Sequence, residues 1–247
     1  MNKYVSNSFD INYAEAWAAD QGGFSYQLAQ NLLEYLNKNK VVAKKALDLC
    51  FGTSEYLAVL SKNGIECHGT ETAKSMVEYS QRNYPNIEYK FVKKLTEIPF
   101  RGKFDIISCN HDMINTLEKF SEWEELFKKA HSSLNKDGIF MFDFYTKNKL
   151  ENWNEVSYEE SEHMDHVRSI KKGIDNKCIM NSIYYIQNTE GYYAKTFDVT
   201  VEAYFENSQI INALQKAGFK KIELLNMALE KIDKPETRNR IHVIASK

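Results

Sequence analysis

The 247-residue sequence lacks several features that mark other broad classes of protein. It has only three prolines and four cysteines, and no apolar run reaches the length that a membrane-spanning helix needs. We recognise no signal peptide at its start, so we expect neither export nor membrane attachment. The cysteines show no paired spacing, and three of them fall in or just after predicted strands. This predicts reduced thiols and a cytoplasmic protein.

A strong excess of one charge is also absent. The formal net charge is −2, and the lysine pairs are spread along the chain instead of gathering in one segment. Nucleic acid is therefore not an expected partner. The few prolines and the absence of low-complexity segments argue against flexibly linked domains, so we expect one domain spanning residues 1–247. The sequence leaves open whether it is a monomer or a homodimer.

The most informative stretch is residues 45–57, where a short apolar run ends in a polar turn that contains glycine. The pattern predicts a buried strand, a tight turn and the start of a helix. Backbone N–H groups at a helix start point at whatever lies in front of them, and Gly52 lets a ligand approach the turn closely. Glu71 follows the second predicted strand, where a bound nucleoside presents its ribose hydroxyls.

Strands and helices alternate through the first half of the chain. A capping box of Ser121 and Glu124 predicts the start of the helix after the fourth strand. Single helices between strands imply right-handed crossovers and a parallel sheet, which binds ligands outside the carboxyl ends of its strands. The expected strands are 45–50, 65–70, 87–92, 104–109, 139–143, 219–229 and 241–245.

Residues 8–40 are expected to be helical, with the glycine pair at 22–23 breaking the segment in two. Aromatic residues spaced four apart occupy one face of the first part. The segment would either pack on the core or form a lid over a bound ligand. These aromatic residues are Phe9, Tyr13 and Trp17.

Residues 150–205 depart from the alternation of strands and helices. Alternating apolar and polar residues over 178–186, a turn, and a strand returning towards Phe205 predict an antiparallel insertion. On a helix, His163 and His166 could share a metal ion. No third ligand has a fitting spacing, so we expect a solvated stretch and no metal site.

The stretch at 47–54, Leu-Asp-Leu-Cys-Phe-Gly-Thr-Ser, resembles the first motif of the class I S-adenosylmethionine-dependent methyltransferases. Glu71 stands where that family has an acidic residue after its second strand. Two side chains differ from the family pattern. Phe51 is bulky where a small residue is usual, and Ser54 replaces a glycine.

Other segments extend the resemblance over nearly the whole chain. Residues 104–107 are similar to the family's fourth strand, residues 134–140 to the turn before its fifth, and residues 217–219 to the corner before its sixth. The run from Tyr13 to Tyr26 resembles the N-terminal cover of amino-sugar N-methyltransferases. Lys94 stands where the family has an acidic residue that pairs with adenine, and lysine offers no acceptor.

The resemblance implies a Rossmann-like, doubly wound α/β fold with a seven-stranded, mostly parallel sheet. An N-terminal helical cover (1–40) and an antiparallel β insertion acting as a substrate lid (150–205) would flank a cofactor-binding core (41–149 and 206–247). The implied cofactor is S-adenosyl-L-methionine, with S-adenosylhomocysteine as product. Expected cofactor-binding residues are Tyr13, Trp17, Asp48, Cys50, Gly52, Thr53, Glu71, Thr72, Met76, Lys94, Leu95, Cys109 and Asn110.

Methyl transfer from a sulfonium is an in-line displacement, and positioning alone can supply about 7–11 kcal/mol of barrier reduction. His111, whose unperturbed pKa is near neutral, is the expected base; the alternative is a loop histidine bonded to a carbonyl. The resemblance to amino-sugar and small-amine N-methyltransferases favours a small acceptor with an amine nitrogen. Expected substrate-binding residues are Tyr26, His111, Asp112, Tyr145, Glu202 and Tyr204.

Two other functions remain open at this point. The first is a non-catalytic relative whose cofactor site is spoiled by Phe51, Ser54 and Lys94. The second is a nicotinamide-dependent oxidoreductase, which is less favoured because Gly52 stands alone and the G-x-G-x-x-G pattern is absent.

Overall fold

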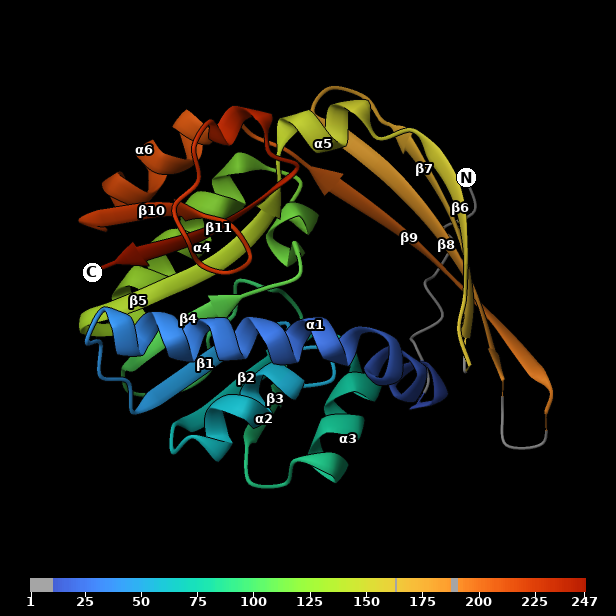
Figure 1. Ribbon diagram of the computed structural model, residues 1–247, viewed down its shortest axis with the longest axis horizontal. Helices are drawn as coiled ribbons and strands as arrows, with labels where there is room; N and C mark the ends of the chain where they lie inside the picture. Colours follow the sequence, from blue (N-terminus) through green and yellow to red (C-terminus); the bar gives the residue numbers. More distant parts are fainter. Residues whose placement is uncertain (1–10, 163, 188–190) are drawn as a thin grey trace.

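The computed structural model describes residues 11–162, 164–187 and 191–247, and in them two separate sheets (Figure 1). The larger sheet has seven strands in the order β10-β11-β5-β4-β1-β2-β3. Its pairings are parallel except that β11 runs antiparallel to both β5 and β10. This confirms the predicted seven-stranded, mostly parallel sheet. The strands are β1 (Lys45–Leu49), β2 (Glu66–Glu71), β3 (Glu88–Phe91), β4 (Phe104–Cys109), β5 (Leu134–Tyr145), β10 (Lys221–Leu225) and β11 (Arg240–Ser246).

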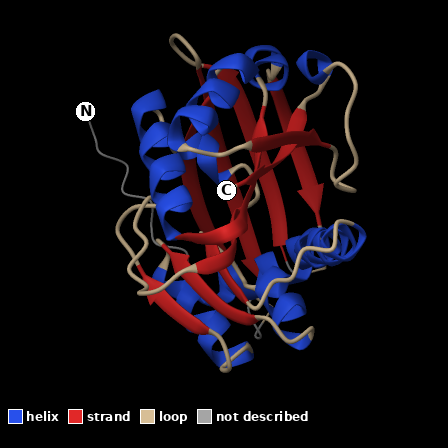
Figure 2. Cartoon of the chain, turned by 90° about the vertical axis from the view of Figure 1, so that its left-hand side faces the viewer, coloured by secondary structure: helices blue, strands red, loops and turns tan. Residues whose placement is uncertain are grey.

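Helices cover both faces of this sheet (Figure 2), so the fold is doubly wound. One face packs against α1 (Ile11–Lys38), α2 (Glu55–Lys62) and α3 (Lys74–Asn83). The other face packs against α4 (Phe120–Ser133) and α6 (Asn207–Ala217). Each helix buries its apolar stripe against the strands, which is why the sequence alternates between the two kinds of element.

Helix α1 is continuous, so the predicted break at the glycine pair is wrong. A Cβ atom at Gly22 would lie 3.2 Å from Cγ of Glu55, so the missing side chain lets α1 approach α2 closely. Each glycine costs about 1 kcal/mol of helix propensity, and packing of the fully buried Leu28 and Leu32 on the sheet outweighs that cost.

The start of α4 also differs from the prediction. The helix begins at Phe120, and the Glu122 carboxylate accepts the Lys119 N–H at 3.1 Å. Ser121 therefore lies inside the first turn, and the Ser121–Glu124 capping box is wrong. A glutamate three residues after the N-cap closes the box, and Glu122 meets that spacing from Lys119.

The second sheet is the predicted antiparallel insertion, and its strand order is β6-β7-β8-β9. The short helix α5 (Lys147–Asn152) connects β5 to it. The first two of its strands were not predicted from the sequence. His166 lies on β7 and not on a helix, and His163 lies outside the described residues. Within those residues, no group of three His, Cys, Asp or Glu side chains could hold a metal ion. The strands are β6 (Glu155–Glu160), β7 (Met164–Lys172), β8 (Lys177–Gln187) and β9 (Tyr193–Ala203).

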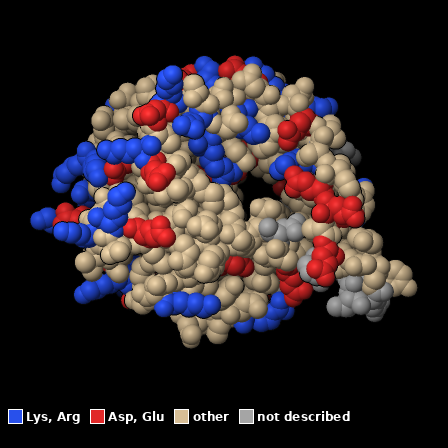
Figure 3. Space-filling view, in the orientation of Figure 1, with Lys and Arg blue, Asp and Glu red and all other residues tan. Residues whose placement is uncertain are grey.

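The N-terminal half of α1 joins the core to the insertion. Tyr13 stacks on Trp17 with ring centroids 5.8 Å apart and meets the ring of Tyr184 on β8 edge-on at 5.0 Å. Met76 of α3 packs into the same cluster. Figure 3 shows a hollow between the body of the molecule and the insertion sheet. No helix in the described part of the chain is long and apolar enough to cross a membrane.

Candidate functional site

The candidate site lies where β1 and β4 are neighbours, because the chain leaves these two strands in opposite directions along the sheet. Asp48 of β1 is buried beside Ser108 of β4, whose hydroxyl donates to Asp48 Oδ1 at 2.6 Å. Burial raises the pKa of Asp48 to about 7, against the Ser108 hydrogen bond. The Asn110 amide nitrogen lies 3.4 Å from the same oxygen, while the buried Asn110 Oδ1 has no partner among the described residues.

The backbone of the turn after β1 is open towards the carboxyl ends of β1 and β4, a region we call the crevice. Cys50, Gly52 and Ser54 all have left-handed backbone angles, with φ of 56°, 60° and 75°. A Cβ atom at Gly52 would meet no atom within 4 Å, so a ligand can approach the backbone there. The Gly52 N–H donates to Glu71 Oε2 at 3.0 Å, which ties the turn to the end of β2.

Glu71 is buried, and it holds the turn and the start of α3 together. Its Oε1 atom accepts the N–H groups of Thr72 at 2.6 Å and Ala73 at 3.0 Å, and the Thr72 hydroxyl at 3.2 Å. Burial raises the pKa of Glu71, and these backbone donors oppose the rise. A carboxylate offers about four acceptor positions. Oε2 accepts only the Gly52 N–H among the described residues and therefore keeps room for one ligand hydroxyl, whereas Oε1 already accepts three donors.

The two unusual side chains of the turn lie beneath it and not in the crevice. The Phe51 ring packs over Gly69 of β2, where an added Cβ would come within 2.4 Å of Phe51 Cδ1. Its centroid is 4.7 Å from that of Tyr89, and the Tyr89 hydroxyl also bonds the Ser54 hydroxyl at 2.9 Å. The space that a bulky Phe51 needs is thus supplied by the missing side chain of Gly69.

Most of the remaining residues expected to bind cofactor lie in one of two buried clusters. Cys50, Leu95 and Cys109 are buried in one core cluster near the strand ends, and burial raises the pKa of both thiols. The Lys94 side chain is exposed, so it does not line this cluster. The second group gathers where α1 meets α3 and the insertion, and comprises Tyr13, Trp17 and Met76. Thr53 is buried and donates to Glu55 at 2.6 Å, and Thr72 is exposed.

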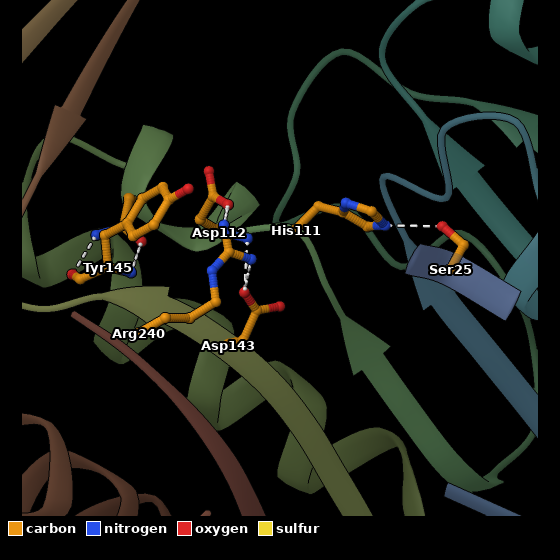
Figure 4. Close-up of polar contacts among 7 residues, drawn as sticks. Ser25, His111, Asp112, Asp143, Tyr145 and Arg240 are labelled. Atoms are coloured by element: carbon orange, nitrogen blue, oxygen red, sulfur yellow. Dashed lines mark hydrogen bonds and ion pairs between the residues drawn. The ribbon is translucent and has the colours of Figure 1, made fainter. Parts of the chain in front are cut away.

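His111 follows β4 and points towards α1, away from the other polar groups of its loop (Figure 4). Its Nε2 atom lies 2.8 Å from the Ser25 hydroxyl, and its ring packs against Phe24 with centroids 4.7 Å apart. Burial lowers the pKa of His111 to about 4. The ring is therefore neutral near pH 7 and accepts a proton less readily than an ordinary histidine.

Arg240, which was not predicted from the sequence, holds together a cluster of side chains after β4 and β5 (Figure 4). Its guanidinium pairs with Asp112 and donates to Asp143 Oδ2 at 2.5 Å, and it lies 4.3 Å from the Tyr145 ring centroid. Burial raises the pKa of Asp112 to about 7, although Arg240 opposes the rise. No local motif marks Arg240. The pairing of β11 with β5 places it opposite Tyr145.

The insertion contributes buried side chains to the same region. Asn115, in the short helix η1 (Met113–Thr116), donates to the Ala203 carbonyl at 2.8 Å and the Tyr145 carbonyl at 3.0 Å, which fixes the end of β9 to the core. Glu202 and Tyr204 are both buried, so they face inwards, one of the two orientations left open by the sequence. Tyr26 is 54% exposed and is not brought to the crevice.

The sheet order and the open turn at its switch point define a Rossmann-like α/β protein, a fold in which ligands bind outside the carboxyl ends of the strands. The Methyltransferase domain family matches residues 21–224, and the chain belongs to that family.

Relatives and solved structures agree with this assignment. "Putative methyltransferase GWCH70_2453" of Geobacillus sp. is 24% identical over 83% of this chain and 85% of its own length. A crystal structure of an S-adenosylmethionine-dependent methyltransferase from Clostridium acetobutylicum superposes with a TM-score of 0.78 at 17% identity, covering 89% of this chain and 90% of that one. The sugar N-methyltransferase KedS8 from Streptoalloteichus superposes at 0.77 and 15% identity, covering 100% and 95%. At these identities the structures show the shared fold.

Proposed function

We propose that the chain transfers a methyl group from S-adenosylmethionine to a small-molecule acceptor, by in-line displacement at an amine nitrogen. The observation that carries the proposal is the crevice at the switch point, where the open backbone at Gly52 faces the acceptor groups of Asp48, Glu71 and Asn110. In a chain of the methyltransferase-domain family, these oxygens are suitable acceptors for the ammonium and hydroxyl groups of an adenosyl sulfonium.

The described residues fit the cofactor group by group. The unpartnered Asn110 Oδ1, beside the Asp48 carboxyl, suits the ammonium of the methionine part. The free acceptor position on Glu71 Oε2 suits a ribose hydroxyl. Leu95 and Cys109 supply an apolar wall for adenine, with the backbone at Lys94 and Leu95 as its polar contact. Bound there, S-adenosylmethionine supplies an electrophilic methyl group.

The chain's own residues position the reactants and exclude water. The cluster of Tyr13, Trp17 and Met76 closes the crevice between α1 and the insertion, which supports a lid role for residues 1–40 and 150–205 in a single domain. We place a small acceptor in the hollow against the insertion sheet (Figure 3), and the net charge of −2 does not favour a nucleic acid as the partner. Free thiols at all four cysteines support a cytoplasmic setting.

The test is a methyl-transfer assay with isotopically labelled S-adenosylmethionine and a set of small amines, alcohols and carboxylates, with products identified by mass. We expect label in an amine and stoichiometric S-adenosylhomocysteine. Label found in an alcohol or a carboxylate would support methyl transfer but refute the proposal that the acceptor is an amine. Failure to bind S-adenosylmethionine would favour a non-catalytic binding protein, for which Phe51 and Ser54, lying beneath the turn, offer no support.

A further inference from the structure

The feature that the proposed function leaves unexplained is Glu202 on β9. Its residue is only 2% exposed, yet Oε2 is buried without a hydrogen-bond partner among the described residues. Glu202 pairs with Cys178 of β8 on the inner face of the insertion sheet, the face that packs on α5 and Tyr145. A buried carboxyl oxygen without a partner is costly, which points to a ligand that supplies the missing donor.

The charges around Glu202 show which kind of ligand fits. Arg240 is shared between Asp112 and Asp143, so that group carries one excess negative charge. Arg168 is paired with Glu159 at 2.9 Å and adds no net charge. Lys149, whose ammonium lies 3.8 Å from the Trp153 ring in the same cluster, adds one positive charge. With Asp112, Asp143 and Glu202 ionised, the three carboxylates still exceed Arg240 and Lys149 by one negative charge, so the region suits a cation. The titratable groups that influence Glu202 are Asp112, Arg240, Arg168, Lys149, Tyr145 and Cys178.

We propose that Glu202 is a catalytic residue that binds the cationic nitrogen of the methyl acceptor and takes its proton. The inference rests on the proposed function and specifies the acceptor as a primary or secondary ammonium. Glu202 lies next to the core at this point, because the carbonyl of its neighbour Ala203 accepts a hydrogen bond from Asn115 at 2.8 Å. Asn115 also bonds the Tyr145 carbonyl at 3.0 Å, and the Tyr145 ring lies 4.3 Å from the Arg240 guanidinium.

Proton transfer to Glu202 precedes methyl transfer. The ammonium R–NH₃⁺ gives one proton to the Glu202 carboxylate and becomes the neutral amine R–NH₂. The nitrogen lone pair then forms the bond to the methyl carbon, the carbon–sulfur bond breaks, and its electron pair stays on sulfur as a thioether. The product leaves as R–NH₂⁺–CH₃, and Glu202 returns its proton to solvent.

Glu202 suits this task better than His111, the base expected from the sequence. Burial, together with the nearby charge of Asp112, raises the pKa of Glu202 to about 8, closer to that of an ammonium than an ordinary carboxyl. His111 is turned to Ser25 and has a pKa lowered to about 4. The proton therefore has a better-matched acceptor on the insertion than on the core loop.

The experiment compares the full-length wild type with Glu202→Gln, Glu202→Asp and the exposed control Glu155→Gln. Ethanolamine, cyclohexylamine and glucosamine serve as acceptor probes, and calorimetry measures S-adenosylmethionine binding by each variant. We expect Glu202→Gln to keep cofactor affinity and lose about 100-fold or more in kcat/KM. Its pH profile should lose the limb near pH 8 and follow only the ionisation of the free amine. Glu202→Asp should retain that limb at reduced rate, and Glu155→Gln should match the wild type.

Each result decides the inference. Activity of Glu202→Gln within about threefold of wild type, with its pH limb intact, overturns it. If Glu202→Gln does not fold, loss of the limb in folded Glu202→Asp also overturns it. Wild type that binds S-adenosylmethionine but methylates none of the three amines overturns the ammonium acceptor while leaving the cofactor proposal standing. Wild type that binds no S-adenosylmethionine refutes the proposed function itself.

Discussion

At the scale of single residues, the turn after β1 tolerates a phenylalanine because β2 has a glycine directly beneath it. Phe51 occupies the volume that a side chain at residue 69 would fill. The Phe51 ring also packs against Tyr89. The Tyr89 hydroxyl bonds that of Ser54, which has a left-handed backbone conformation at the start of α2. Phe51 and Ser54, which depart from the family pattern, are thus accommodated by Gly69 and Tyr89, which lie further along the chain.

We expect Gly69→Ala to lower the free energy of unfolding by about 1–3 kcal/mol, because the new methyl group overlaps the Phe51 ring. Chemical denaturation measures the change. In a Phe51→Ala background the same substitution should be much milder, giving a coupling energy of about 0.5–3 kcal/mol. Strictly additive effects would show that the two residues do not share this space.

The residues that could be predicted from the sequence are those fixed by the local motif. Asp48, Gly52 and Glu71 lie at consecutive strand ends, so the strand pattern alone brings them together. Arg240 reaches the crevice only through the antiparallel register of β11 with β5, and the inward orientation of Glu202 only through the register of β8 with β9. Register between distant strands has no local sequence signal, so these contacts could not be predicted.

At the scale of elements, α1 both packs on the sheet and reaches the insertion. The apolar stripe of its C-terminal half was clear from the sequence, whereas its continuity through Gly22 depends on the close approach to α2. Strands β6 and β7 were missed because their polar residues alternate weakly and pair only with each other and with β8. In α1 at Gly22 and in β6 and β7, the local sequence preference is weak, and tertiary contacts determine the secondary structure.

Replacing Tyr13 by alanine should separate the cover from the insertion. The variant loses the stack on Trp17 and the edge contact with Tyr184, so we expect about 3–5 kcal/mol of destabilisation if the molecule unfolds as one unit. Hydrogen exchange should accelerate first in the N-terminal half of α1 and in β8. Tyr26→Ala, at a position 54% exposed on the same helix, should change stability by less than about 0.5 kcal/mol. Equal effects of the two substitutions would contradict the contact.

At the scale of the whole molecule, buried carboxyl groups gather around the crevice and make stability depend on pH. Burial raises the folded-state pKa of Asp48 and Asp112 to about 7 and that of Glu202 to about 8, above unfolded values near 4. Between about pH 4 and pH 8 these carboxyl groups bind more protons in the folded chain than in the unfolded chain, so the free energy of unfolding falls as pH rises. His111, with its lowered pKa, acts in the opposite sense, but only between about pH 4 and pH 6.5.

We therefore expect the free energy of unfolding of the ligand-free protein to decrease from about pH 6.5 to pH 8. Each carboxyl contributes up to about 1.4 kcal/mol per pH unit where its folded form is protonated and its unfolded form is not. Denaturant titrations across this range measure the slope. Glu202→Gln should flatten it, and exposed Glu155→Gln should leave it unchanged. A Glu202→Gln slope equal to that of the wild type would show that Glu202 ionises normally in the folded chain.

The central claim is that the crevice at the β1–β4 switch holds an adenosyl cofactor, and calorimetric titration with S-adenosylhomocysteine tests it most directly. The account predicts one site per chain, weakened by about 1.5–3 kcal/mol in Asp48→Asn, which removes a buried charge beside the ligand. Asp175→Asn, the same change at an exposed turn, should bind as the wild type does. Folded protein that releases no heat at millimolar S-adenosylhomocysteine, or an Asp48→Asn variant with unchanged affinity, would contradict the account.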